Sequence, residues 1–260
     1  MEDTKISIIT VSYNAANVIE KTIQSVINQT YTNIEYIIID GGSTDGTVDI
    51  IKKYEGKLAY WISEPDKGIY DAMNKGIEIA TGEWINFMNA GDGFNNATVL
   101  KKISDKNYFQ SKDFQVLYGD AIVVCSDSSK RLIKAGRNLK EQWKGPIFRH
   151  GAMFVRTSIH KKNQFKLDSQ FKICADFDLI YNLFLSSYSF SYVDEIIMYF
   201  ERDGVSNSRV RCAKDNKMVV LSYSPCLKYE FWHDIHIIRA YFIDMFIKPL
   251  LYLLSNKNQK

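Results

Sequence analysis

The first third of the chain alternates between short apolar runs and amphipathic stretches, and this alternation restricts the folds open to it. Residues 5–13 form a nearly continuous run of Ile, Val and Thr, as in a strand buried on both faces. Apolar residues then recur at helical spacing over 18–27, which predicts a helix with one buried face. Further strand-like runs follow at 35–40, 60–63 and 83–92. We therefore expect an α/β fold with a mostly parallel sheet and helices on both faces.

The remainder of the chain has a less regular pattern. We expect strands within 115–125, 148–156 and 189–200, and a helix at 177–186. Residues 229–254 place apolar side chains on one helical face, which predicts a C-terminal amphipathic helical extension. With 260 residues, 46% of them hydrophobic, the chain has enough apolar surface for one large domain.

Charge is distributed unevenly along the chain. Residues 1–129 carry 11 Lys and Arg against 18 Asp and Glu, whereas residues 130–172 carry 12 against 2. The basic segment is either a solvated surface or a face for an anionic partner, such as a phosphate-bearing substrate or a membrane. The overall net charge of +3 is too small to indicate nucleic acid.

Cysteine spacing and hydropathy bear on location. The four cysteines have no CxxC spacing, and the first residues are acidic without an apolar core, which fits a reducing cytoplasm. No uncharged apolar run is long enough for a spanning helix, so none is expected. We therefore expect a cytoplasmic protein.

Polar residues stand where three of the expected strands end. The first run ends at Tyr13 and Asn14, the second at Asp40 and the fourth at Asp92. Ligands bind at the carboxyl ends of strands in an open parallel sheet. A Tyr can stack on a base, and an Asp beside a diphosphate can hold a divalent metal through its oxygens. A single Asp at a strand end is also a common turn or cap residue. The prediction of a ligand site therefore depends on polar residues standing at three strand ends together.

The segment 63–76 is unusually polar for the start of a core helix. Asp71 and Asn74 are three residues apart and share one helix face. Gly68 could bring the helix N-terminus, with its free N–H groups, close to a phosphate. The alternative is that this face simply meets solvent.

Four segments in order resemble family 2 glycosyltransferases, and in particular the subgroup that makes bacterial surface polysaccharides. They are ISIITVSYN at 6–14, IIDGGSTDGT at 38–47, EPDKGIYDAMNKG at 64–76 and TGEW at 81–84. The resemblance is strong over about 5–98 and looser to about 206. It implies a GT-A fold, a uridine or guanosine diphosphate sugar as donor, a divalent metal (Mn²⁺ or Mg²⁺) and an inverting mechanism.

The resemblance also assigns candidate roles to residues of the donor side. Tyr13 and Asp40 match positions that contact the base, and Asp92 matches the last acidic residue of the metal-binding DxD-like motif. Asn89 stands at the more usual first Asp of that motif, and Met73 stands where the family often has Arg; Lys67 is the expected substitute for that missing cation. The candidate donor-binding residues are Thr10, Tyr13, Asn14, Asp40, Lys67, Asp71 and Asn74, with Asp92 and Asn89 as metal ligands.

Candidate acceptor-side residues come from the second half of the chain. Asp176 matches the family's catalytic base, with Ala175 in place of the preceding Glu, although acidic residues also suit the start of a helix for its dipole alone. Asp178 is then a structural or acceptor-contacting neighbour. His150 resembles the border of the acceptor site, or is a structural histidine. Arg202 and Ser206 resemble a loop that closes over the donor diphosphate, or form a surface turn.

Together these features predict an inverting glycosyltransferase of polysaccharide biosynthesis with a saccharide or lipid-linked acceptor. We expect a nucleotide-sugar-binding half at 1–98, an acceptor-binding half at 99–225 and a helical extension at 226–260. Residues 226–254 could touch a membrane surface, with the protein peripheral to its inner face, or could pack on the catalytic domain or in a homodimer. The rival interpretations are a nucleotidyltransferase and a non-catalytic sugar-nucleotide-binding protein. The absence of Gly, Lys and Arg from 10–17 argues against the first, and Asn89 with Ala175 makes the second conceivable.

Overall fold

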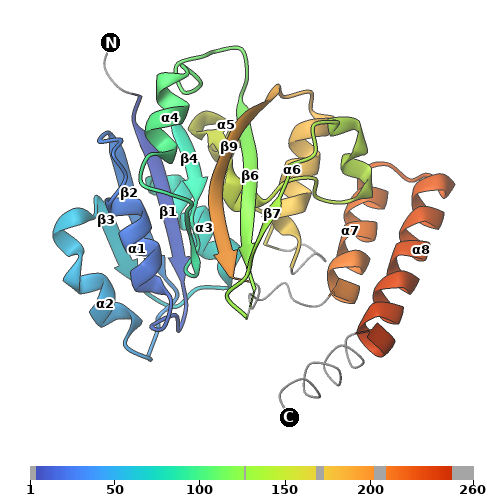
Figure 1. Ribbon diagram of the computed structural model, residues 1–260, viewed down its shortest axis with the longest axis horizontal. Coiled ribbons are helices and arrows are strands. Elements are labelled where there is room, and N and C mark those ends of the chain that lie inside the picture. Colours follow the sequence, from blue (N-terminus) through green and yellow to red (C-terminus); the bar gives the residue numbers. More distant parts are fainter. Residues whose placement is uncertain (1–3, 126, 168–172, 202–208, 248–260) are drawn as a thin grey trace.

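The computed structural model describes residues 4–125, 127–167, 173–201 and 209–247. Within these residues a single nine-stranded sheet runs through the molecule, with helices on both sides (Figure 1). The strands are β1 Ile6–Ser12, β2 Ile34–Asp40, β3 Tyr60–Ser63, β4 Trp84–Phe87, β5 Asp92–Phe94, β6 Val116–Val124, β7 Lys130–Ile133, β8 Met153–Arg156 and β9 Phe190–Glu201. The α-helices are α1 Ile19–Ile27, α2 Thr47–Lys53, α3 Ile69–Ile79, α4 Val99–Asp105, α5 Thr157–Lys162, α6 Ala175–Leu185, α7 Arg209–Tyr223 and α8 Leu227–Phe242.

The sheet combines a parallel half with a mixed half. Its order is β3-β2-β1-β4-β8-β6-β9-β5, and β7 pairs with β6 outside this path. Strands β1 to β4 are parallel to their neighbours in this group, as predicted. Strand β8 then runs antiparallel to β4 and β6, whereas β9 is parallel to β6. The fold is therefore α/β with a largely parallel sheet, as expected, and the sheet joins residues 1–98 to 99–225.

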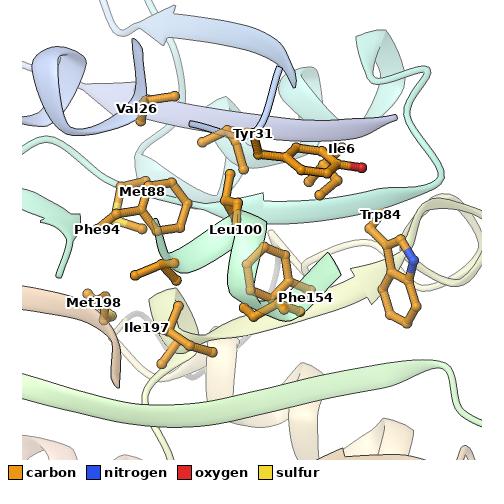
Figure 2. Close-up of a cluster of buried hydrophobic side chains, with 14 of the residues drawn as sticks. Ile6, Val26, Tyr31, Trp84, Met88, Phe94, Leu100, Phe154, Ile197 and Met198 are labelled. Carbon is orange, nitrogen blue, oxygen red and sulfur yellow. The ribbon is translucent and has the colours of Figure 1, made fainter. Parts of the chain in front are cut away.

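Two hydrophobic cores cover the two faces of this sheet. In β1, Ile6 and Ile8 face the core that includes α1 and α4, whereas Ile9 and Val11 face the core that includes α3 and α6. The continuous apolar run is thus explained by burial on both faces. Figure 2 shows the first core, in which Trp84 and other large side chains interlock. Burying one such side chain contributes about 1.5–3 kcal/mol.

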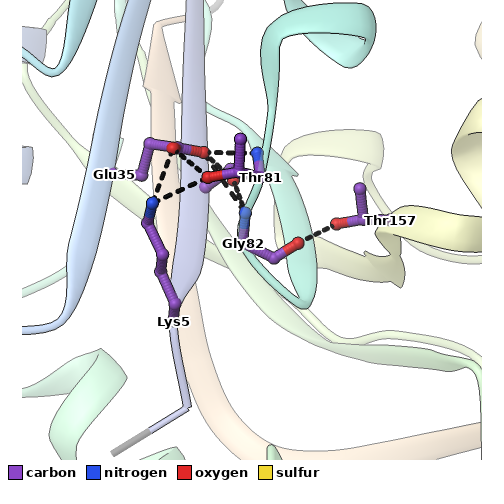
Figure 3. Close-up of polar contacts among 6 residues, drawn as sticks. Lys5, Glu35, Thr81, Gly82 and Thr157 are labelled. Carbon is purple, nitrogen blue, oxygen red and sulfur yellow. Dashed lines mark hydrogen bonds and ion pairs between the residues drawn. The ribbon is translucent and has the colours of Figure 1, made fainter.

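A buried carboxylate ties the strands together at the end of the sheet away from their carboxyl termini (Figure 3). Glu35 accepts hydrogen bonds from Lys5 (2.8 Å), Ser7 (2.6 Å) and the backbone N–H of Thr81 (2.7 Å). Burial by itself would raise the pKa of Glu35, but these hydrogen bonds outweigh it and lower the pKa to about 2. Glu35 therefore joins β1, β2 and the segment before β4 through its charged form.

The structure corrects three boundaries. Strand β4 ends at Phe87, and Asp92 begins β5 instead of closing β4. Only the end of 148–156 is a strand, because residues His150–Ala152 form a short 3-10 helix before β8. The C-terminal helical region consists of α8 and a π-helical turn at Ile243–Ile247, and the rest of the predicted helix to residue 254 lies outside the described residues.

Helices α7 and α8 lie side by side at one end of the molecule, beyond α6 (Figure 1). Trp143, in the 3-10 helix Leu139–Lys144, stacks on Tyr229 of α8 at 4.5 Å between ring centroids. Its backbone carbonyl also lies 2.8 Å from Nε2 of the buried His233. Within the described ranges, no helix combines the length and apolar character needed to cross a bilayer.

Candidate active site

The carboxyl ends of β1, β2 and β3 lie at one edge of the sheet, as expected. Ser12 is the register partner of Asp40, which in turn is the partner of Ser63. The segment after β4 continues along β1, because the backbone N–H of Ala90 donates to the carbonyl of Val11 at 3.1 Å. The polar residues singled out at these strand ends are therefore neighbours in space.

Asp40 is the centre of a dense hydrogen-bond network at this edge. Its carboxylate accepts from the hydroxyls of Ser12 (2.8 Å), Ser43 (2.6 Å) and Ser63 (2.7 Å) and from the backbone N–H of Ser43 (2.8 Å). Burial acts to raise the pKa of Asp40, but the bonds from Ser43 and Ser63 outweigh it and hold the pKa below its usual range. Asp40 is fully buried, and its bonds to Gly42 and Ser43 hold the loop at 41–43 in this arrangement. The sequence did not single out its serine partners.

Tyr13 and Asn14 lie on the surface beside that loop. The Tyr13 side chain is 66% exposed. Asn14 has a positive φ of 47°, and its side-chain oxygen accepts from the backbone N–H of Thr44 at 2.9 Å. A Cβ on Gly41 would collide with Asp66 and touch the Tyr13 ring, so both side chains approach the backbone there. Asp66, which the sequence did not single out, thus borders the same surface.

Two other donor-side candidates are turned into the protein, which corrects their expected place. Thr10 is fully buried; its hydroxyl lies 2.9 Å from the Tyr36 hydroxyl and donates to the carbonyl of Met88 at 2.7 Å. The Asn74 side chain donates to the Phe165 carbonyl (2.8 Å) and accepts from the Phe165 N–H (2.9 Å). Both residues hold segments of the chain together.

Asp71 and Lys67 remain near the start of α3. The Asp71 carboxylate accepts from the backbone N–H of Lys67 at 3.0 Å, which fixes the turn before the helix. The Lys67 side chain is exposed and makes no ion pair with another described residue. Met73, at the position where the family often has Arg, is buried in the core.

Asp92 lies at the end of a tight turn that α1 holds in place. The N–H of Asp92 donates to the carbonyl of Asn89 at 2.8 Å, and Gly91 between them has a φ of 99°. The hydroxyl of Thr22 donates to the Asp92 carbonyl (2.6 Å) and accepts from the Gly91 N–H (3.0 Å). In the sequence Thr22 is one member of the helical stripe, so its contact with the turn could not be recognised there.

The side chains of Asn89 and Asp92 suit a divalent cation that a substrate helps to hold. The side-chain oxygen of Asn89 is buried without a hydrogen-bond partner, and such a group normally has one. Burial raises the pKa of Asp92 to about 7, against the opposing attraction of Arg149, so a nearby cation would favour its charged form. The described residues contain no group of three or more His, Cys, Asp or Glu suited to a metal. Hard oxygen ligands fit Mg²⁺ or Mn²⁺, and the remaining ligands would have to come from a diphosphate and water.

Asp176 lies in the first turn of α6, as predicted, beside Tyr70 of α3. The Tyr70 hydroxyl lies 3.4 Å from the Asp176 carboxylate and donates to the Ile173 carbonyl at 2.8 Å. Burial, reinforced by the negative charge of Asp176, raises the pKa of Tyr70 well above its usual range, so the phenol keeps its proton. By contrast, Asp178 is buried and forms an ion pair with Lys166 at 3.1 Å, which gives it a structural place.

His150 begins the 3-10 helix that precedes β8, and Arg149 is the residue before it. His150 stacks on Phe87 at 5.2 Å between ring centroids, and its Nε2 is buried without a hydrogen-bond partner. Burial lowers the pKa of His150, although Asp176 opposes this. Arg149, which the sequence did not single out, interacts electrostatically with both Asp176 and Asp92. The candidates Arg202 and Ser206 lie outside the described residues.

Comparison of the sequence with known proteins identifies a family. The pattern described as glycosyl transferase family 2 matches residues 7–163. An uncharacterized glycosyltransferase of Mycobacterium tuberculosis, Rv1514c, is 44% identical over 96 residues, which cover 36% of this chain and 37% of the relative. A PGL/p-HBAD biosynthesis glycosyltransferase of Mycobacterium bovis is 30% identical over 60% of this chain and 56% of the relative. The chain thus spans between about a third and somewhat over half the length of these curated relatives.

Solved structures share the fold at low sequence identity. The mannosyltransferase PcManGT of Pyrobaculum calidifontis, in complex with GDP-Man and Mn²⁺, has a TM-score of 0.69 and 15% identity, covering 100% of this chain and 81% of that one. TarS 1-349 of S. aureus, in complex with UDP-GlcNAc, has a TM-score of 0.66 and 18% identity, covering 92% and 72%. At such identities the likeness concerns the fold.

Proposed function

From the finding that the chain belongs to glycosyl transferase family 2, we propose that it transfers a sugar from a nucleoside-diphosphate sugar to a hydroxyl of a saccharide or lipid-linked acceptor. The transfer inverts the configuration at the anomeric carbon and serves polysaccharide biosynthesis. The observation that carries the proposal is the packing of Arg149 over Phe200, the cross-strand partner of Asp92, together with its electrostatic interaction with Asp176. This arrangement supports a candidate metal ligand and a candidate base that act on one substrate.

On the donor side, the exposed ring of Tyr13 offers a face for stacking on the base. The oxygens of Asn89 and Asp92 would hold the divalent cation. When bound, that cation supplies positive charge for the departing diphosphate. Thr22 keeps the turn carrying Asp92 in position through its two hydrogen bonds.

On the acceptor side, Asp176 takes the proton from the acceptor hydroxyl. The hydroxyl oxygen forms a bond to the anomeric carbon from the face opposite the diphosphate, and the bond between that carbon and the diphosphate oxygen breaks with its electron pair. Tyr70, fixed by the Ile173 carbonyl, keeps the Asp176 carboxylate oriented toward the site. Sugar transfer and the release of a nucleoside diphosphate then follow from residues that the fold brings together.

The test of this proposal is the variant Asp176→Asn. Loss of a positioned base reduces turnover by roughly 10²- to 10⁴-fold, whereas affinity for a nucleoside diphosphate stays close to that of the wild type because Asp176 is on the acceptor side. Turnover is measured by nucleoside diphosphate release from a panel of uridine and guanosine diphosphate sugars, with and without Mn²⁺. Asp178→Asn serves as the isosteric control, which should lower thermal stability more than turnover.

The same panel separates the rival functions. A non-catalytic binding protein would bind a nucleotide sugar without turnover in the wild type, and a nucleotidyltransferase would release pyrophosphate from a nucleoside triphosphate. Normal turnover by Asp176→Asn would contradict the assignment of the base while leaving the donor side intact.

We further propose that α8 rests on an anionic lipid surface at the inner face of a membrane. Large apolar side chains project from the face of α8 opposite the one packed on the protein. The stripe continues into the π-helical turn after α8 and is called the α8 stripe; it consists of Leu227, Phe231, Ile235, Ile238, Phe242, Met245 and Phe246. Because these side chains are exposed, packing of this face on the described part of the catalytic domain does not account for the helical pattern.

The charges around the α8 stripe favour lipid as its partner. Lys228 of α8 and Lys144 of the basic segment both lie over the Trp143 ring, each 5.6 Å from its centroid, and Arg239 lies in the last turn of α8. The acidic residues Glu230 and Asp234 both form ion pairs with Lys217, at 3.6 Å and 2.6 Å, which offsets part of their negative charge. Apolar stripes flanked by basic residues and Trp are typical of helices that lie on membranes. Such an arrangement would bring the site close to a lipid-linked acceptor.

A further inference from the structure

The proposed function calls for a positively charged side chain beside the donor diphosphate. The family pattern leads one to expect an Arg at position 73, and Lys67 was the substitute suggested by the sequence. Met73 is buried among apolar side chains, so this position cannot present a charge. Lys67 is exposed at the turn before α3, where only its backbone N–H has a described bond, to Asp71.

Arg149 occupies a more central position. Its guanidinium lies over the ring of Phe200 at 4.9 Å from the centroid. Phe200 is the direct cross-strand partner of Asp92 in the β5–β9 ladder. The next residue along the chain, His150, stacks on Phe87 at the end of β4. The Arg149 guanidinium therefore lies over the residue that pairs with the first residue of β5.

The Arg149 guanidinium has unused hydrogen-bonding capacity. Among the described residues it forms neither a hydrogen bond nor an ion pair, although Asp92 and Asp176 both attract it. The side chain is exposed, yet burial of the charged group lowers its pKa; an arginine nevertheless remains charged. A planar group with five N–H donors matches the paired oxygens of a phosphate.

We propose that Arg149 binds the diphosphate of the donor beside Asp92 and supplies the positive charge for which position 73 is unsuited. This inference rests on the proposed function. As the bond from the anomeric carbon to the diphosphate oxygen breaks, its electron pair stays on that oxygen, while the acceptor oxygen forms the new bond and its proton passes to Asp176. The Arg149 N–H groups donate to the diphosphate as this negative charge develops.

The test compares ligands that differ only in their phosphates. Binding of UDP and uridine, and of GDP and guanosine, is measured by calorimetry with Mn²⁺ for the wild type, Arg149→Met and Arg149→Lys. Lys67→Met is measured as the rival cation, and Lys57→Met, which removes an exposed lysine outside the proposed site, is the control. We expect Arg149→Met to weaken binding of the preferred diphosphate by roughly 10- to 100-fold, as for loss of hydrogen bonds to a charged group, and to leave the matching nucleoside unchanged. Arg149→Lys should recover part of the loss, and Lys57→Met should bind like the wild type.

The outcomes separate this inference from the function on which it rests. Equal binding of the diphosphate by Arg149→Met and the wild type would overturn the role of Arg149 and leave the proposed function standing. The same holds if Lys67→Met alone loses the phosphate-dependent part of the affinity. A wild type that binds neither diphosphate would overturn both. Unchanged thermal unfolding of Arg149→Met in the absence of ligand shows that the variant is folded.

Discussion

At the scale of single residues, Glu35 makes a prediction about stability and pH. Its pKa lies near 2 in the folded protein, below the ordinary value of 4.5, because Lys5, Ser7 and Thr81 donate hydrogen bonds that outweigh the effect of burial. The unfolded chain therefore takes up this proton first as pH falls. Above pH 4.5 Glu35 contributes about 3 kcal/mol to the free energy of unfolding. This contribution declines as the pH falls from about 4.5 to about 2, and about 2 kcal/mol of it is lost by pH 3.

The check is the free energy of unfolding in urea at pH 6 and pH 3, measured for the wild type, Glu35→Gln and the exposed control Glu55→Gln. We expect Glu35→Gln to be less stable at pH 6 and to lose less stability than the wild type between the two pH values. Identical pH profiles of Glu35→Gln and the wild type would show that another group controls acid unfolding.

How far the sequence predicts individual site residues depends on what each one contacts. Asp92 and Asp176 could be named because motif and position in a strand or helix are local properties. Thr10 and Asn74 matched the same motifs, yet their partners are Met88 and Phe165, which only the folded chain brings near. Arg149 precedes a short 3-10 helix without a recognisable motif, and its importance comes from β5 pairing with a strand about a hundred residues away.

At the scale of elements, helix α1 positions the turn that carries Asp92. In Thr22→Val the side chain keeps its shape but loses its hydroxyl, so the Asp92 carbonyl and the Gly91 N–H lose a partner in a buried setting. Leaving such groups unpaired costs about 1–3 kcal/mol. We expect a higher Mn²⁺ concentration for half-maximal turnover together with lower thermal stability. Ser25→Ala, one turn further along α1, is the control, and a stability loss without a change in the Mn²⁺ dependence would argue against the positioning role.

The elements themselves followed from hydrophobic periodicity where that pattern was local. Strands β1 and β2 and helix α1 have the predicted positions, because each is a continuous pattern buried on one or two faces. Strand β3 also lies where it was predicted. The end of β4 was misjudged: the apolar run continues along β1 to Ala90 without a strand assignment, and the chain then reverses at Gly91. The reversal of β8 relative to β4 was equally inaccessible, since pairing direction depends on contacts between distant segments.

At the scale of the whole molecule, the exposed α8 stripe predicts binding to anionic lipid. The double variant Phe231→Glu with Phe242→Glu places charges on two strongly exposed positions, 69% and 56% accessible, so folding should be preserved. We expect the full chain to float with liposomes containing phosphatidylglycerol, and to float less at high salt because salt screens the basic residues beside the stripe. The double variant should not bind the liposomes. Leu185→Glu, an exposed leucine on α6, should float like the wild type. If the wild type fails to float and sediments as a dimer that the double variant turns into a monomer, the stripe joins two copies of the chain instead.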